Sequence, residues 1–210
     1  METAKINYND EFLKELDLIK SKNYKPTLLL HICCGPCFTY PYELLKNHFR
    51  ITIFYNNSNI FPEAEYHRRL TELKKYLKAI NADIPIIEPP YDNDAYNVDL
   101  LPYADQKEGG DRCRICFTKR LEKTFSYASK NHFDYYGTVM SISRFKNSQI
   151  LNEIGFEIAK NSLYTKWLPA DFKKNGGYEK SLKIVRDFKI YFQDYCGCKF
   201  SIRRKIEEFK

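Results

Sequence analysis

Residues 27–37 read TLLLHICCGPC, a short apolar run that leads into three cysteines, a glycine and a proline. The continuous apolar pattern from Leu28 to Ile32 predicts a buried strand, and Pro41 with Glu43 indicates the start of a helix. The cysteines would then occupy a strand-to-helix turn. In an open α/β sheet such turns lie at the carboxyl edge of the strands, where ligands bind, and helix N-termini favour anions and thiolates. We therefore expect the chemistry of the protein at this turn.

Outward from this stretch, strand and helix patterns alternate. Further strands are predicted at residues 51–55, 84–87 and 133–140, and helices at 42–48, 66–80, 111–128, 150–158, 182–188 and from Ser201 onward. Residues 91–110 lack a clean period and are expected to form a long loop. The alternation predicts an α/β fold, with a Rossmann-like parallel sheet flanked by helices in a single domain. Residues 1–24, with Asn9 or Asp10 as helix cap, would be an N-terminal helical extension, and residues 25–210 the catalytic domain.

Composition and charge limit the class of protein. The chain has 210 residues, 43% hydrophobic and 16% aromatic, which is enough for one full core and argues against disorder. The charged N-terminus is unlike a signal peptide, and no apolar run approaches the ~18 residues of a membrane span. We therefore expect a cytoplasmic protein with no membrane partner. Residues 173–210 hold 11 Lys and Arg against 5 Asp and Glu, which fits either a polyanionic partner such as RNA or an ordinary solvated surface.

All seven cysteines fall in three clusters, at 33, 34 and 37, at 113 and 116, and at 196 and 198. In a reducing compartment such clusters favour metal binding or redox catalysis over structural disulfides. Three chemistries are open. A thioredoxin-like dithiol fits Cys34-Gly-Pro-Cys37 but leaves the other clusters unexplained. A four-cysteine zinc site leaves three thiols idle. An iron-sulfur centre accommodates more than four sulfurs that come from distant loops.

Five stretches of the sequence, taken together, resemble one known protein family: LLLHICCGPC, FYNNSNIFPEAEYHRR, EGGDRCRICFTKRLE, FKNSQILNEIG and FQDYCGCKFS. In this order and spacing, from about residue 28 to 201, the chain resembles the QueH family of epoxyqueuosine reductases. The resemblance implies an oxidoreductase that reduces epoxyqueuosine to queuosine at the wobble position of tRNA, the last step of queuosine biosynthesis. The implied substrates are the tRNAs for Tyr, His, Asn and Asp, which have GUN anticodons, and the electron donor is unidentified. The implied fold is of the adenine-nucleotide-hydrolase type, with the cysteine turn in place of an SGGxDS phosphate loop.

The resemblance also implies roles for single residues. Cys33, Cys34, Cys113 and Cys116 would hold a [4Fe-4S] cluster, and Cys37 and Cys198 would be ligands of an additional iron ion. Cys196 and Cys198 would be either a redox-active pair that can close a disulfide or ligands of that second metal. The candidate proton donors are Asp194, which we expect to be catalytic, and Tyr195, Tyr55 and His67. Stacking on the tRNA base is expected from Tyr91, Tyr96 and Tyr103. Phosphate contacts are expected from Arg68, Arg69, Arg112, Arg114, Lys119, Arg120, Arg203, Arg204 and Lys205. A thioredoxin-like oxidoreductase acting on proteins is the alternative function.

Overall fold

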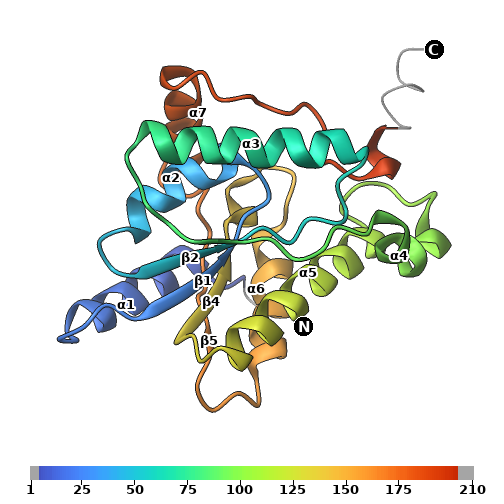
Figure 1. Cartoon of the computed structure of the whole chain (residues 1–210). Coiled ribbons are helices and arrows are strands. Elements are labelled where there is room, and N and C mark those ends of the chain that lie inside the picture. Colours follow the sequence, from blue (N-terminus) through green and yellow to red (C-terminus); the bar gives the residue numbers. More distant parts are fainter. Residues whose placement is uncertain (1–4, 203–210) are drawn as a thin grey trace.

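A computed structural model describes residues 5–202 of the chain (Figure 1). Its centre is a sheet of five parallel strands in the order β3-β2-β1-β4-β5. The strands are β1 (Thr27–His31), β2 (Arg50–Phe54), β3 (Ile86–Ile87), β4 (Tyr135–Thr138) and β5 (Lys166–Trp167). The predicted α/β class with a parallel, helix-flanked sheet is confirmed.

Helices cover both faces of the sheet. The α-helices are α1 (Tyr8–Lys20), α2 (Gly35–Leu45), α3 (Glu63–Ala79), α4 (Asn93–Asn97), α5 (Asp111–Lys130), α6 (Ser148–Ala159) and α7 (Gly177–Asp187), and the 3-10 helices are η1 (Val98–Tyr103) and η2 (Val139–Ile142). Helix α2 packs against α3 and α7 on one face, and α5 packs against α6 on the other (Figure 1). None of the helices in residues 5–202 combines the length and apolar character that crossing a bilayer requires.

Strand β1 is the centre of the core. Leu28, Leu29 and Leu30 are completely buried because β2 and β4 flank the strand and helices cover both its faces. The chain builds outward from β1 through β2 to β3, then returns to the other side of β1 as β4. A ligand crevice forms where the strand order reverses in this way, at the carboxyl ends of the two central strands. Here that point lies between the residues that follow β1 and those that follow β4.

The structure corrects several predicted boundaries. Helix α2 begins at Gly35, not near Tyr42, because Pro36 occupies its first turn and Pro41 is accommodated inside the helix. The segment predicted as a loop at 91–110 contains α4 and η1, and β5 was not predicted. A helical stretch occupies residues 199–202, so Ser201 lies inside it instead of capping it. The rest of the predicted last helix lies outside the described residues.

Helix α1 packs on the sheet domain. Asn7, rather than Asn9 or Asp10, caps it by accepting a hydrogen bond from the Asn9 backbone. Its buried face carries Phe12, whose ring meets that of Phe172 edge-on at 5.4 Å. A division of the chain at residue 24 stays a prediction.

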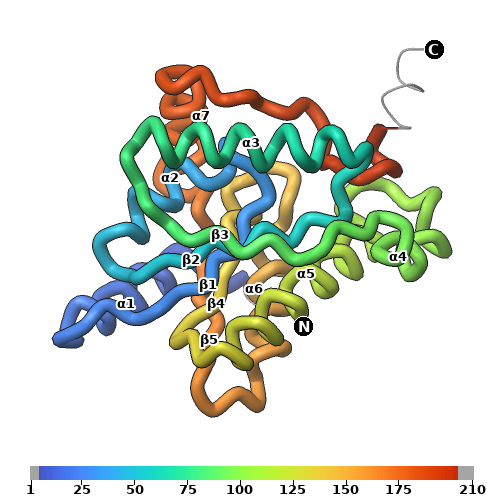
Figure 2. Tube along the Cα trace, viewed as in Figure 1, coloured from blue at the N-terminus to red at the C-terminus, as the bar shows by residue number. Residues whose placement is uncertain are grey.

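The C-terminal loop, residues 188–198, connects distant parts of the fold. After α7 it runs back along α3 toward the N-terminal end of that helix (Figure 2). Two backbone contacts mark its path: the Tyr191 N–H donates to Glu72 Oε2 at 3.2 Å, and the Phe61 N–H donates to the Gly197 carbonyl at 2.7 Å. The loop therefore brings Cys196 and Cys198 over the crevice of the sheet.

Candidate functional site

Three cysteines form a compact, buried sulfur group, which we call the three-thiol group. The Sγ atoms of Cys33, Cys34 and Cys37 all lie within 4.8 Å of one another, and those of Cys33 and Cys34 are 3.7 Å apart. Cys33 and Cys34 follow β1, and Cys37 lies in the first turn of α2. The sharp transition from strand to helix therefore points three thiols at one spot. Cys37 is helical and not part of the turn, because the helix begins earlier than predicted.

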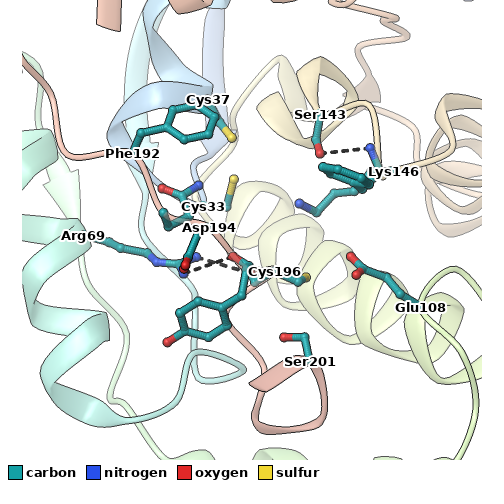
Figure 3. A pocket seen from close by; sticks show the side chains of 13 residues that line it. Cys33, Cys37, Arg69, Glu108, Ser143, Lys146, Phe192, Asp194, Cys196 and Ser201 are labelled. Atoms are coloured by element: carbon teal, nitrogen blue, oxygen red, sulfur yellow. Dashed lines mark hydrogen bonds between the residues drawn. The ribbon is translucent and has the colours of Figure 1, made fainter. Parts of the chain in front are cut away.

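The three-thiol group opens into a cavity of about 490 Å³ (Figure 3). Its wall comes from the β1–α2 connection, α3, the segment after η2 and the C-terminal loop. The lining residues are Cys33, Cys37, Arg69, Glu108, Ser143, Phe145, Lys146, Phe192, Gln193, Asp194, Tyr195, Cys196 and Ser201. The volume is in the range of small-ligand sites, which is roughly 300–1,000 Å³.

The other four cysteines, which we call the outer cysteines, lie on α5 and the C-terminal loop. Tyr96 Oη donates to Cys116 Sγ at 3.2 Å, and the Gly109 N–H donates to Cys113 Sγ at 3.2 Å. Cys198 Sγ lies 3.5 Å from Ser201 Oγ. Cys198 packs with Cys116 around Phe200 in a small apolar cluster. Among residues 5–202, the three-thiol group is the one set of three Cys, His, Asp or Glu ligand atoms gathered so closely.

Gly197 shapes the loop between Cys196 and Cys198. Its φ is +110°, a conformation that favours glycine, and a Cβ there would lie 2.8 Å from Arg69 Nη1. Arg69 in turn donates to the carbonyls of Cys196 and Tyr195, each at 3.3 Å, and its Nε donates to Glu65 Oε1 at 2.7 Å. A buried, ion-paired arginine thus holds the Cys196 turn against α3.

Buried cations surround the thiols. Burial opposes the charge of Lys146, but the thiolates of Cys196 and Cys33 raise its pKa above the ordinary value. Hydrogen bonds from Cys34 and Cys37, followed by the charges of Lys146 and Arg120, hold the pKa of Cys33 well below its usual range. The Cys198 thiol and the same cations lower the pKa of Cys196. Burial raises the pKa of Cys34 to about 12. The site therefore favours one thiolate in the three-thiol group, at Cys33, and one in the C-terminal loop, at Cys196.

Arg120 is fully buried beneath this site. Its Nε donates to His31 Nε2 at 3.2 Å and its Nη2 donates to Asn57 Oδ1 at 2.7 Å. Because a guanidinium only donates, His31 Nε2 must accept, so His31 Nδ1–H donates to Thr138 Oγ1 at 2.8 Å. Burial, and then the Arg120 charge, lower the pKa of His31 to about 3, which keeps the imidazole neutral. Both partners of Arg120 are neutral, and the nearby Cys33 thiolate provides its countercharge.

The donor set fits a thiophilic metal centre. Three convergent thiols in a buried pocket, beside positive charges that stabilise thiolates, are what zinc or iron-sulfur ligation requires. The predicted cluster ligands are only partly grouped, since Cys33 and Cys34 belong to the three-thiol group whereas Cys113 and Cys116 are outer cysteines. That four-cysteine ligand set, and the iron ligands Cys37 and Cys198, stay predictions. All seven cysteines are free thiols, so the structure does not support the expected disulfide.

The structure separates the predicted proton donors. Asp194 and Tyr195 line the cavity, and the catalytic role of Asp194 stays a prediction. Tyr55 is buried and donates its hydroxyl hydrogen to the Tyr66 carbonyl, away from the cavity. His67 is 62% exposed on α3 and lies 3.5 Å from Glu63. Neither Tyr55 nor His67 is among the residues that line the cavity.

Several expected tRNA contacts are also corrected. Arg69, Arg112 and Arg120 are each 2% exposed, so they cannot serve as surface phosphate ligands. Their guanidinium groups bond interior carbonyls and side chains instead. Lys119 pairs with Asp99, whereas Arg68 and Arg114 remain at the surface. Arg203, Arg204 and Lys205 lie outside the described residues.

Seven lining residues were not predicted as site residues: Glu108, Ser143, Phe145, Lys146, Phe192, Gln193 and Ser201. Lys146 reaches into the cavity from the side opposite Phe192 (Figure 3). Each of these residues lies within or beside a stretch that carried the resemblance, EGGDRC, FKNSQ or FQDYCGCKFS. That proximity was the available signal, but no periodic pattern shows which side chain of a loop turns inward.

Fold and site together define a doubly wound α/β protein whose ligand crevice is lined by thiols in place of a phosphate-binding loop. The family model described as "Epoxyqueuosine reductase QueH" matches residues 28–204. An epoxyqueuosine reductase QueH of Streptococcus pyogenes serotype M1 is 38% identical over 95% of this chain and 79% of its own length. Its counterpart in Staphylococcus aureus strain Mu50 is 37% identical over 100% of this chain and 90% of its own length. That of Thermotoga maritima is 29% identical, covering 87% of this chain and 93% of its own. The chain belongs to the epoxyqueuosine reductase QueH family.

Proposed function

We propose that this chain is an oxidoreductase that reduces epoxyqueuosine to queuosine in tRNA. The observation that carries this proposal is the combination of family membership with a thiol-lined cavity at the ligand edge of the sheet. The thioredoxin-like alternative has no support, since the CGPC residues connect β1 to α2 in a fold whose five-stranded sheet is all-parallel, and five further cysteines remain in the chain.

The reaction sets a clear stoichiometry. Converting an epoxide to an alkene breaks two C–O bonds, consumes two electrons and two protons, and releases one water molecule. Oxidation of a Cys196/Cys198 dithiol to a disulfide releases two electrons and two protons, so the two half-reactions balance. An external electron donor, not yet identified, must then reduce the disulfide again. Asp194, at the cavity wall, is the proposed group for passing protons to the leaving oxygen, whereas the Tyr195 hydroxyl donates to the Phe61 carbonyl at 2.7 Å.

The three-thiol group is proposed as the inner part of the metal site. Cys33 and Cys34, with Cys113 and Cys116, would hold a [4Fe-4S] cluster, and Cys37 would hold an additional iron, with Cys198 as a further ligand only while the Cys196/Cys198 pair is reduced. When bound, such a centre supplies single electrons and a Lewis acid. The contribution of the protein is to hold the thiols together and to favour the thiolate at two of them: Lys146 and Arg120 stabilise the thiolates of Cys33 and Cys196, and Arg69 fixes the loop that carries Cys196.

The proposed substrates are tRNAs with GUN anticodons, those for Tyr, His, Asn and Asp, in the cytoplasm. The wobble nucleotide must leave the anticodon stack before its base can reach the thiols inside the cavity. Exposed cations such as Arg68 and Arg114 are the proposed phosphate contacts, so binding should weaken as the salt concentration rises.

The test is turnover by anaerobically purified protein. The enzyme, with a chemical one-electron reductant, is incubated with tRNA that contains epoxyqueuosine, and the digested nucleosides are quantified by mass spectrometry. We expect conversion to queuosine, and no conversion by the Cys33→Ser/Cys34→Ser variant. Wild-type protein with its metal centre intact that yields no queuosine would overturn the proposed function.

A further inference from the structure

Two phenylalanines stand out at the mouth of the thiol-lined cavity. Phe145 is 73% exposed and Phe192 is 47% exposed, and both line the cavity. Of the seven exposed large aromatic side chains among residues 5–202, these two are the ones that line the cavity, and leaving two phenyl rings in water beside the thiols has a free-energy cost without a folding benefit. Exposed aromatic rings at the rim of a polar pocket are typical of ligand contacts.

The two rings come from different elements. Phe145 lies in the segment between η2 and α6, next to Lys146, and Phe192 lies in the C-terminal loop, two residues before Asp194. In Figure 3, Phe192 lies beside Cys37, and Lys146 extends from the opposite wall. The segments that carry the two phenylalanines thus approach the cavity from opposite sides, with Cys33 between them.

The tyrosines of residues 91–110 cannot take the same role. The Tyr91 hydroxyl donates to the Ile60 carbonyl at 2.7 Å, and its ring packs on that of Tyr66 with centroids 4.6 Å apart. The Tyr96 hydroxyl donates to the Cys116 carbonyl at 2.9 Å. Both rings are partly buried and engaged in these contacts, and neither they nor Tyr103 line the cavity.

We propose that Phe145 and Phe192 form a clamp that holds the planar ring of the splayed wobble base, with the epoxide-bearing substituent directed toward Cys33, Cys37 and Cys196. The proposal rests on the proposed function and names the residues that bind the base. A flat aromatic ring suits the clamp because stacking needs only a π-face, whereas the deeper wall offers thiols, a cation and a carboxylate for the polar substituent.

The clamp predicts effects on binding more than on the chemical step. Stacking one base on an aromatic side chain contributes about 1–3 kcal/mol, so Phe145→Ala and Phe192→Ala should each weaken binding about tenfold or more. The probe is an anticodon stem-loop that contains epoxyqueuosine, titrated against the anaerobic holoenzyme by fluorescence anisotropy. KM for the tRNA should rise by a similar factor, whereas kcat at saturating tRNA and the iron content should change little.

Two variants make the test specific. Tyr164→Ala removes a ring that is 78% exposed in the turn between α6 and β5, at the opposite edge of the sheet, and should bind like the wild type. Phe145→Tyr keeps the ring and should retain most of the affinity. Wild-type affinity and KM in both alanine variants, or an equal loss in Tyr164→Ala, would overturn the clamp while leaving the reductase activity established by the wild type. Absence of queuosine formation by the wild type would instead overturn the proposed function.

Discussion

The three-thiol group and the outer cysteines occupy one end of the sheet, but the fold positions them in different ways. Cys33, Cys34 and Cys37 lie within five residues on a single strand–helix connection, and packing around β1 buries all three. The outer cysteines come from α5 and from a loop some 80 residues further along the chain, and three of the four are half-buried. The core fixes the three-thiol group, whereas the positions of Cys196 and Cys198 depend on how the C-terminal loop packs against the rest of the fold.

This difference assigns distinct tasks to the two regions. A preformed group needs little reorganisation to bind a metal. Cys196 is held by polar contacts, chiefly those of Arg69 with the Cys196 and Tyr195 carbonyls, so the loop that carries Cys196 and Cys198 can respond to substrate or to oxidation. We infer that the three-thiol group is the permanent part of the metal site and that Cys196 and Cys198 are its adaptable side.

The largest expected effect comes from removing the inner sulfurs. Cys33→Ser/Cys34→Ser should abolish both iron binding and turnover, because two of the three convergent thiolates are lost. Cys113→Ser/Cys116→Ser should do the same if α5 completes the ligand set. Iron content, measured after anaerobic reconstitution, shows whether each of the two regions is needed to bind the metal. Circular dichroism is the control for folding. Full iron content in the Cys33→Ser/Cys34→Ser variant would contradict the assignment.

A smaller and more selective effect is expected at the loop. Cys196→Ser should retain the iron but lose most of the turnover, because Cys196 lines the cavity as half of the proposed dithiol. The measurement is queuosine formation per iron centre, with Cys198→Ser prepared in parallel. Full turnover by Cys196→Ser would rule out the dithiol role.

The buried cation under both regions should matter for stability. Arg120→Leu leaves His31 Nε2 and Asn57 Oδ1 without their donor, and should lower the free energy of unfolding by about 3 kcal/mol. Urea unfolding of the metal-free protein measures this. Arg114→Leu is the matched control, since Arg114 is half-exposed on the same helix and pairs with Glu153 at 3.5 Å, so its cost should stay below about 1 kcal/mol. Equal costs for the two variants would show that the interior network does not support the site.

The smallest effect is expected where the two regions touch. Gln193 Nε2 donates to Cys34 Sγ at 3.0 Å, but its Oε1 is buried with no hydrogen-bond partner among the described residues. Gln193→Leu removes the bond and the unpaired oxygen together, so the stability should change by less than about 1 kcal/mol. Iron content should be unchanged. Loss of iron in this variant would mean that the loop and the three-thiol group form one inseparable unit.

The sequence was most informative where patterns are regular. The apolar run of β1, the period of α3 and the alternation of strands and helices predicted the parallel sheet, and the cysteine clusters located the site. Strand β5 was not predicted because a strand of two residues is too short to show a periodic pattern of apolar side chains. The predicted start of α2 was wrong because it relied on Pro41 as a residue of the first helical turn. Pro36, closer to the cysteines, carries the same signal of a proline in the first turn.

Side-chain direction was harder to predict than secondary structure. Arg69 and Arg120 were expected at the surface as phosphate ligands because arginine is usually solvated. Their positions on the helices gave a contrary signal, since Arg69 falls in the buried stripe of Tyr66 and Leu73, and Arg120 lies beside Phe117 and Leu121. Lys146 and the phenylalanines of the clamp lie in loops, where only the three-dimensional structure shows which residues face the cavity.

The central claim, that the three-thiol group is the core of an iron-sulfur site, is tested most directly by metal analysis. Iron, acid-labile sulfide and zinc should be quantified together in anaerobically purified protein. We predict sulfide in equal amount to the cluster iron, with further iron beyond it. Zinc alone, or no metal after anaerobic reconstitution, would contradict the account.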